Sequence, residues 1–191
     1  MGPAASTTDT DLLRRIGEGD VGALAALYDR YAPSMLAIAI RIVRDRTEAE
    51  DVVHDSFVLV GERAGQYVAD RGTVAAWLIT LVRNLSIDRK RRNDRRGAIA
   101  RDVFAHEPTV ESPSDADPET SALGADRRER IRRALATLPD VQRTTLEVAF
   151  FEGLSYPEIA EREGVPLGTI KSRAARALAA LRDALNQGED A

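Results

Sequence analysis

The sequence predicts an all-α fold: two small helical domains joined by a flexible acidic linker. Apolar residues recur every three or four positions through most of the chain, which is the spacing of amphipathic helices. This periodicity stops between residues 97 and 126, where the chain is acidic and contains three prolines. At 191 residues and 43% hydrophobic content, the chain can bury more than one small core. We therefore expect domains at residues 9–96 and 127–187.

The first domain should begin with two helices. Asp9 to Glu18 has the pattern of a short amphipathic helix, and Gly19 should end it. Asp20 can then accept a hydrogen bond from the first turn of a longer helix. Pro33 lies inside that longer pattern, and because proline has no backbone N–H it predicts a kink or a break.

Two more helices complete the first domain. Thr47 and Glu50 have the spacing of a capping box, which predicts that the third helix begins there. The pattern weakens after Gly61, and residues 64–72 should form a loop. Thr73 or a neighbour should start the fourth helix, which continues directly into a strongly basic stretch.

The second domain ends in a helix-turn-helix pattern. Ser155 and Glu158 form a capping box, and Gly164 can adopt the left-handed conformation that ends a helix tightly. In the helix that follows, apolar residues predict one buried stripe: Ile170, Ala174, Ala177, Leu178, Leu181 and Leu185. Polar and cationic residues mark the face that should remain exposed: Thr169, Lys171, Ser172, Arg173 and Arg176.

This arrangement points to DNA. A major groove roughly 12 Å wide admits one α-helix, whose side chains can then reach base edges and phosphates. Arg176 is our first candidate for a bidentate contact to guanine. The alternative is that the cations only solvate an amphipathic helix, but the cap, the glycine hinge and the polar face agree with one another.

The charge distribution supports contact with nucleic acid in two places. The net charge is −4, yet residues 83–96 contain seven basic and two acidic side chains, and residues 127–187 contain eleven and eight. The mean charge therefore conceals two cationic segments.

The chain has no cysteine, which excludes disulfides and thiolate metal sites. No apolar run is long enough to cross a bilayer and no signal-peptide core is evident, so we expect a cytoplasmic protein without membrane insertion.

The first domain presents two unlike surfaces. Its basic helix end lies near Tyr67, Trp77 and the 64–72 loop in sequence, a combination that suits unstacked single-stranded bases. Trp77 is expected to serve the core, and Asn84 is the better candidate for touching a base. The third helix presents an acidic face, which is either simply solvated or a docking surface for a basic protein. Its residues are Glu48, Asp51, His54, Asp55 and Glu62.

Three stretches resemble a known family. They read EAEDVVHDSFVLV, AAWLITLVRNLSIDRKRR and LPDVQRTTLEVAFFEGLSYPEIAEREGVPLGTIKSRAARAL. They are similar to the region-two and region-four segments of bacterial extracytoplasmic-function sigma factors, in the expected order and over roughly residues 9–187. The resemblance implies a dissociable specificity subunit of RNA polymerase that is not an enzyme and needs no cofactor.

The resemblance also implies a role for particular residues. Core polymerase would dock on the acidic helix through Asp51, His54 and Asp55, although many relatives have glutamine in place of His54. Asn84 and the 64–72 loop would capture a flipped base of the melted minus-ten element. Arg83, Arg89, Arg91 and Arg92 would hold strand phosphates. The minus-thirty-five element would be read by Thr169, Lys171, Ser172, Arg173 and Arg176, and Ala175 stands where some relatives have a larger side chain.

Partners follow from the same resemblance. Core RNA polymerase and promoter DNA are expected, together with an anti-sigma factor that covers the binding faces. The chain would then be a monomer or a heterodimer rather than a homo-oligomer. The acidic linker would either thread polymerase channels that otherwise carry nucleic acid or act as a plain solvated tether.

Two other classes of protein explain parts of the sequence. A polymerase-independent helix-turn-helix regulator would explain the C-terminal third, but it gives no reason for the basic segment at 83–96. A metal-dependent phosphohydrolase would use the His54-Asp55 dipeptide. That site needs further histidine ligands, and the only other histidine is His106, in the expected linker.

Overall fold

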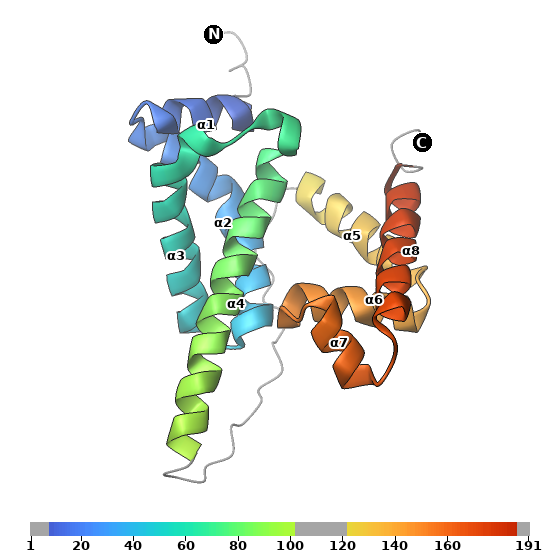
Figure 1. Cartoon of the computed structure of the whole chain (residues 1–191). Helices are drawn as coiled ribbons and strands as arrows, with labels where there is room; N and C mark the ends of the chain where they lie inside the picture. The colour runs from blue at the N-terminus through green and yellow to red at the C-terminus, as the bar shows by residue number, and fades with distance from the viewer. Residues whose placement is uncertain (1–7, 102–121, 187–191) are drawn as a thin grey trace. The chain divides into compact units, whose positions relative to one another are not determined.

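The computed structural model describes residues 8–101 and 122–186, and the chain divides into two compact units, Met1–Ala116 and Asp117–Ala191. The described residues form α-helices, two short 3₁₀ turns and one π-helical turn, and no strand occurs among them (Figure 1). The expected all-α class is therefore confirmed. Most of the expected linker lies outside the described residues. Helix extends into both of its ends, however, because α4 continues to Arg101 and α5 begins at Ala122.

The described part of the first unit, residues 8–101, contains four helices and a short turn region. These elements are α1 (Asp9–Gly17), α2 (Val21–Val43), α3 (Arg46–Arg63), η1 (Ala64–Gln66), η2 (Ala69–Arg71) and α4 (Val74–Arg101). As predicted, Asp20 caps α2, where its carboxylate accepts the backbone N–H of Ala23 at 3.1 Å. Thr73 caps α4 in the same way, since its hydroxyl accepts the N–H of Ala76 at 3.2 Å.

The predicted start of α3 was wrong. Its cap is Asp45, whose carboxylate accepts the N–H of Glu48 at 2.8 Å, and Thr47 already lies inside the helix. Arg44 explains the difference: it ends α2 in the left-handed conformation, with φ of 61°. The chain therefore reverses at Arg44, and Asp45 is the first extended residue that can cap the next helix.

Helix α2 also continues through Pro33 without a break. A proline inside a helix removes one backbone hydrogen bond and costs about 3 kcal/mol. Met35 and Ala39, two and six residues further along, are fully buried in the core of the unit. Burial of this face on the other helices offsets the cost, because tertiary packing contributes most of the stability of helices in proteins.

The core of the first unit draws on all four helices. Large side chains with almost no exposed area include Leu13, Leu27, Met35, Val52, Val60, Leu78 and Val82. Trp77 is half-buried and packs against this core, as expected. Two serines are also fully buried, and each satisfies its hydroxyl within its own helix: Ser56 donates to the carbonyl of Val52 and Ser86 to that of Val82, both at 2.7 Å.

The second unit is smaller. Its elements are α5 (Ala122–Ala136), α6 (Asp140–Glu147), the π-helical turn η3 (Val148–Glu152), α7 (Tyr156–Glu163) and α8 (Leu167–Asn186). Val148, Ile159 and Ile170 form the centre of its core. Arg130 of α5 donates to the carbonyl of Leu185 at 2.9 Å, which joins α5 to the last turn of α8.

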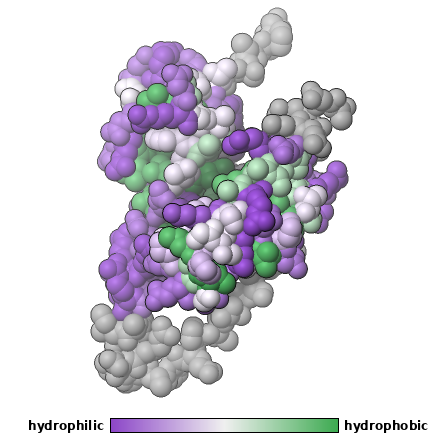
Figure 2. Space-filling model, turned by 45° about the vertical axis from the view of Figure 1, so that its right-hand side comes forward, coloured by the Kyte–Doolittle hydropathy of each residue, from purple (hydrophilic) through white to green (hydrophobic). Residues whose placement is uncertain are grey.

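Hydrophilic residues cover most of the face shown in Figure 2, and hydrophobic residues show between them. Leu178 is one of the exposed hydrophobic residues, at 52%, so its assignment to the buried stripe of α8 was wrong. The period of an α-helix places Leu178 about 40° beyond Ala174 and 100° beyond Ala177, so it lies at the edge of the packed face. Among the described helices, none combines the length and the hydropathy required to span a bilayer.

Candidate interfaces with nucleic acid and with a protein partner

The turn between α7 and α8 has the predicted geometry. Ser155 and Glu158 form a complete capping box: Glu158 accepts the N–H of Ser155 at 2.6 Å, and Ser155 accepts the N–H of Glu158 at 3.5 Å. Gly164 ends α7 in the left-handed conformation, with φ of 66°. An L side chain is strained in that conformation, which explains the glycine. Sequence and structure therefore agree on how α8 is set against α7.

Helix α8 has one packed face and one open face. Ile170, Ala174 and Ala177 are at most 1% exposed. Lys171, Ser172 and Arg176 are exposed, and Thr169 is half-buried at the start of the helix. The structure therefore brings Thr169, Ser172 and Arg176 together on one side of α8, whereas Lys171 lies about 140° from Arg176 around the helix.

Three of these residues form a short hydrogen-bonded chain. The Arg176 guanidinium donates to the Ser172 carbonyl at 3.2 Å and to its hydroxyl at 3.1 Å, and that hydroxyl donates to the Thr169 carbonyl at 3.0 Å. These contacts are local and lie along the exposed side of one helix. A guanidinium has five N–H donors, so Arg176 keeps donors for a base while Ser172 limits where it can point.

Arg173 is placed differently from its neighbours. Its guanidinium pairs with the carboxylate of Glu163 in α7 at 2.6 Å, and the two side chains are only 19% and 27% exposed. The contact crosses the turn and ties the end of α7 to α8. Sequence reasoning gave Glu163 no role, although a glutamate ten residues before an arginine, across a glycine turn, was visible in the sequence.

The predicted loop at 64–72 is compact rather than open, because it contains the two 3₁₀ turns. Tyr67 supports it in two ways. The Tyr67 hydroxyl donates to the carbonyl of Gly72 at 2.8 Å, and its ring meets the edge of Trp77 with 6.0 Å between centroids. The shape of the loop is therefore tied to the core through Trp77. Sequence reasoning noticed the two aromatics but not this bond.

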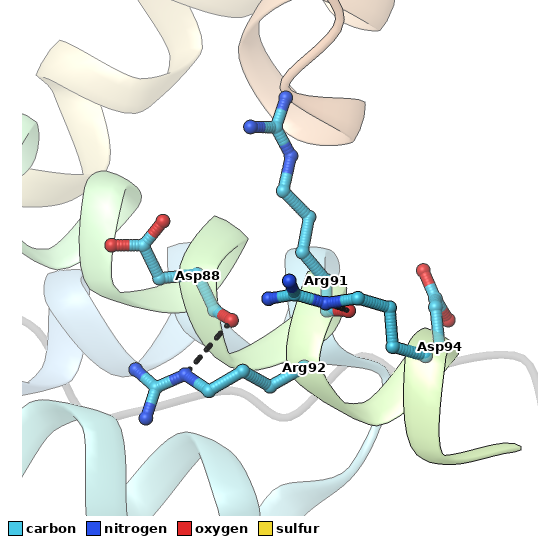
Figure 3. A pocket seen from close by; sticks show the side chains of 5 residues that line it. Asp88, Arg91, Arg92 and Asp94 are labelled. Carbon is cyan, nitrogen blue, oxygen red and sulfur yellow. Dashed lines mark hydrogen bonds between the residues drawn. The ribbon is translucent and has the colours of Figure 1, made fainter. Parts of the chain in front are cut away.

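The basic side chains of α4 point in different directions. Asn84 is exposed, and its side-chain oxygen accepts a hydrogen bond from Arg83 at 3.1 Å. Figure 3 shows Arg91 and Arg92 extending from α4 in different directions beside Asp88 and Asp94. These residues line an open hollow on the helix surface, and Arg92 donates to the carbonyl of Asp88 at 3.2 Å. Arg83 is partly buried, and this burial, followed by the positive charge of Arg91, lowers the pKa of its guanidinium below the usual value.

Arg89 faces α3. Its guanidinium contacts three carboxylates: Glu48 at 2.8 Å, Asp55 at 3.4 Å and Asp51 at 3.9 Å. Arg89 is 24% exposed and Glu48 33%, whereas Asp51 and Asp55 remain 62% and 58% exposed. His54 lies on the exposed side of the same helix. The predicted docking residues Asp51, His54 and Asp55 therefore share one surface. Arg89, which was predicted to bind phosphate, contacts this surface.

Each of the two units matches a known protein family. Residues 27–96 match the family described as Sigma-70 region 2, and residues 128–181 match Sigma-70, region 4. The chain is 35% identical over 180 residues to the ECF RNA polymerase sigma factor SigK of Mycobacterium sp. strain KMS, covering 94% of this chain and 92% of the relative. It is 32% identical over 186 residues to SigK of Mycobacterium tuberculosis strain H37Rv, covering 97% and 98%.

Solved structures are similar as well. SigE of Rhodobacter sphaeroides, solved in complex with the anti-sigma ChrR, is 31% identical, with a TM-score of 0.48 and coverage of 94% of this chain and 99% of that one. The sequence matches decide the class. The chain belongs to the sigma-70 family, among the ECF RNA polymerase sigma factors.

Membership of this family sets aside both other classes of protein. The chain is a non-enzymatic transcription initiation factor that binds core RNA polymerase and promoter DNA. The phosphohydrolase interpretation of His54-Asp55 is therefore rejected. The polymerase-independent regulator is also rejected, because region 2 accounts for the basic segment at 83–96 that such a regulator left unexplained.

Proposed function

We propose that the two units divide promoter recognition between them, with α8 on the duplex minus-thirty-five element and α4 with its preceding loop on the opened minus-ten element. The observation that carries this proposal is the two-sided character of α8. Ile170, Ala174 and Ala177 hold the helix against its unit, while Lys171, Ser172 and Arg176 remain exposed. A helix packed on one face and polar on the other can enter a major groove without rearranging.

On the duplex element, Arg176 is proposed to donate to a guanine. Ser172 and Thr169 support its guanidinium from below, and Lys171 contacts the phosphate backbone. A bidentate arginine contact discriminates between bases because only guanine offers two acceptors at the matching spacing in the major groove. Arg173 stays a predicted DNA contact, but it shares its guanidinium with Glu163.

On the opened element, Asn84 and the 64–72 loop are proposed to capture a flipped base. Arg83, Arg91 and Arg92 would then hold phosphates of the same strand. Asn84 and Arg91 are seven residues apart, which places them within about 20° of each other around the helix axis. Favourable binding of the extruded base and exposed strand offsets the cost of unpairing, so the chain can open DNA without catalysing a reaction.

Core polymerase is proposed to dock on the surface formed by Asp51, His54 and Asp55. The two carboxylates are well exposed and would repel DNA, so this face suits a basic protein surface. Because the polymerase is the partner, the proposed place of action is the cytoplasm. Family membership further supports regulation by an anti-sigma factor that covers these faces.

The proposal is tested by transcription in vitro. Purified core polymerase is supplied with a promoter selected from the native host, with and without this chain. Start sites that require the chain support the proposal. Initiation at the same sites and rates without it would refute the proposed division of promoter recognition.

A further inference from the structure

We propose that Arg89 is a positioning residue of the polymerase-docking surface and not a contact to DNA. The proposal rests on the docking role proposed above for Asp51 and Asp55. It is carried by the arrangement of one guanidinium among three carboxylates from another helix, with Glu48 at 2.8 Å, Asp55 at 3.4 Å and Asp51 at 3.9 Å.

The position of Arg89 on α4 separates it from the proposed DNA contacts. At 100° per residue, Arg89 lies about 140° around the helix from Asn84, whereas Arg91 lies nearly in line with Asn84. A strand that follows Asn84 and Arg91 therefore passes over the other side of the helix. Turning Arg89 toward that strand would leave Glu48, which is only one-third exposed, without its partner.

The three carboxylates need a shared cation. Glu48, Asp51 and Asp55 follow one another at intervals of three and four residues, so they lie on one face of α3 and repel each other. Arg89 relieves this repulsion, and its planar fork can contact more than one carboxylate at a time. Glu48 and the guanidinium form the less exposed end of the cluster, while Asp51 and Asp55 extend from it toward solvent.

This arrangement has a consequence for docking. Asp51 and Asp55 are held at a fixed spacing before polymerase arrives, so less side-chain entropy is lost on binding. Lysine at position 89 would keep the positive charge but lose the fork, because an ammonium group is a point charge on a flexible chain. The geometry therefore predicts that charge alone does not replace Arg89.

The experiment measures the affinity of the full chain for core polymerase and, separately, the salt dependence of holoenzyme binding to promoter DNA. The variants are Arg89→Ala, Arg89→Lys and the neighbouring control Lys90→Ala. The control also removes one positive charge, but it leaves the contacts between Arg89 and α3 in place. We expect Arg89→Ala to weaken core binding about three- to tenfold, Arg89→Lys to restore it only in part, and Lys90→Ala to change it less than twofold. The salt slope of DNA binding should not change with Arg89→Ala.

A double-mutant cycle separates positioning from general support of the fold. In an Asp51→Ala, Asp55→Ala background, Arg89→Ala should have no further effect on core affinity, since the side chains it positions are gone. A fully additive loss would overturn the inference, as would a smaller salt slope with unchanged core affinity, which would make Arg89 a phosphate contact. If the Asp51→Ala, Asp55→Ala chain binds core polymerase normally, the docking proposal itself fails, whatever Arg89 does.

Discussion

Arg173 and Glu163 join the two helices of the helix-turn-helix through an ion pair of 2.6 Å that is mostly shielded from solvent. The pair spans the glycine turn, so it links α7 to α8 in addition to the turn and the shared core. An arginine on a reading helix is usually interpreted as a DNA contact. Here the same side chain has a structural partner, and the two roles can be separated by changing one partner at a time.

We expect Arg173→Ala and Glu163→Ala to destabilise the second unit to a similar extent, by about 1 kcal/mol. For a unit of this size, such a loss lowers the unfolding midpoint by roughly 4–8 °C. Thermal unfolding followed by circular dichroism measures it. If Arg173→Ala reduces promoter affinity at a temperature where both variants are folded, and Glu163→Ala does not, then Arg173 contacts DNA in addition to pairing with Glu163.

Arg176→Ala should reduce affinity for the matching promoter by about 1–3 kcal/mol and relax preference at one base pair. Arg91→Ala should instead weaken holoenzyme binding to a similar degree on every sequence, with a smaller dependence on salt. Competition between matched and scrambled promoters at several salt concentrations distinguishes the two. Equal effects of both variants on both DNAs would argue against the assignment of α8 as the reading helix.

Tyr67→Phe should slow promoter opening while leaving recognition of duplex DNA unchanged. The variant keeps the ring against Trp77 but loses the hydrogen bond to the Gly72 carbonyl, which contributes about 0.5–1.5 kcal/mol to holding the loop. We therefore expect opening to fall about two- to tenfold, measured by permanganate reactivity of unpaired thymines. Opening at the wild-type rate would mean that the loop needs no such support.

Asp51→Arg should weaken binding to core polymerase by at least about tenfold, because it places a cation against a basic partner and beside Arg89. Asp29→Arg, on the exposed side of α2, is the matched control and should retain normal affinity. Fluorescence titration with labelled chain measures both. Equal losses in the two variants would indicate a general charge effect and not a docking site.

Asp20 provides a prediction about pH. The Arg15 guanidinium, and then the N–H of Ala23, hold the pKa of this carboxyl below its usual range. A lowered folded-state pKa stabilises the fold above the unfolded value of about 3.9, and this contribution is lost as pH falls through the folded value. Asp20→Asn should therefore lower the unfolding midpoint at pH 6, and the difference from wild type should shrink toward pH 3. A difference that does not depend on pH would contradict this account.

Helix periodicity and capping residues predicted much of the fold. The helix-turn-helix was predictable in detail because Ser155, Glu158 and Gly164 determine it locally. The start of α3 was not, because a left-handed Arg44 has no distinctive sequence pattern and it decides which residue caps the helix. The continuity of α2 at Pro33 was also beyond local reasoning, since it depends on what Met35 and Ala39 pack against.

For the candidate sites, the sequence predicted which helix face each residue lies on, but it did not predict which side chains contact one another across two helices. Sequence spacing places Asp51 and Asp55 on one helix face, and it places Thr169, Ser172 and Arg176 on another. It does not show that Arg89 crosses to α3 or that Arg173 turns back to α7, because both depend on how two helices pack. A basic segment therefore looks uniform in sequence although its side chains have different partners in the structure.

The side chains that hold α8 in place, Ile170, Ala174 and Ala177, are a different set from the ones that remain exposed on its other face. Changes at Arg176 can therefore alter which promoter is chosen without loosening the packing of α8. New preferences could arise in duplicated copies of such a chain by a few substitutions, without a compensating change elsewhere in the unit.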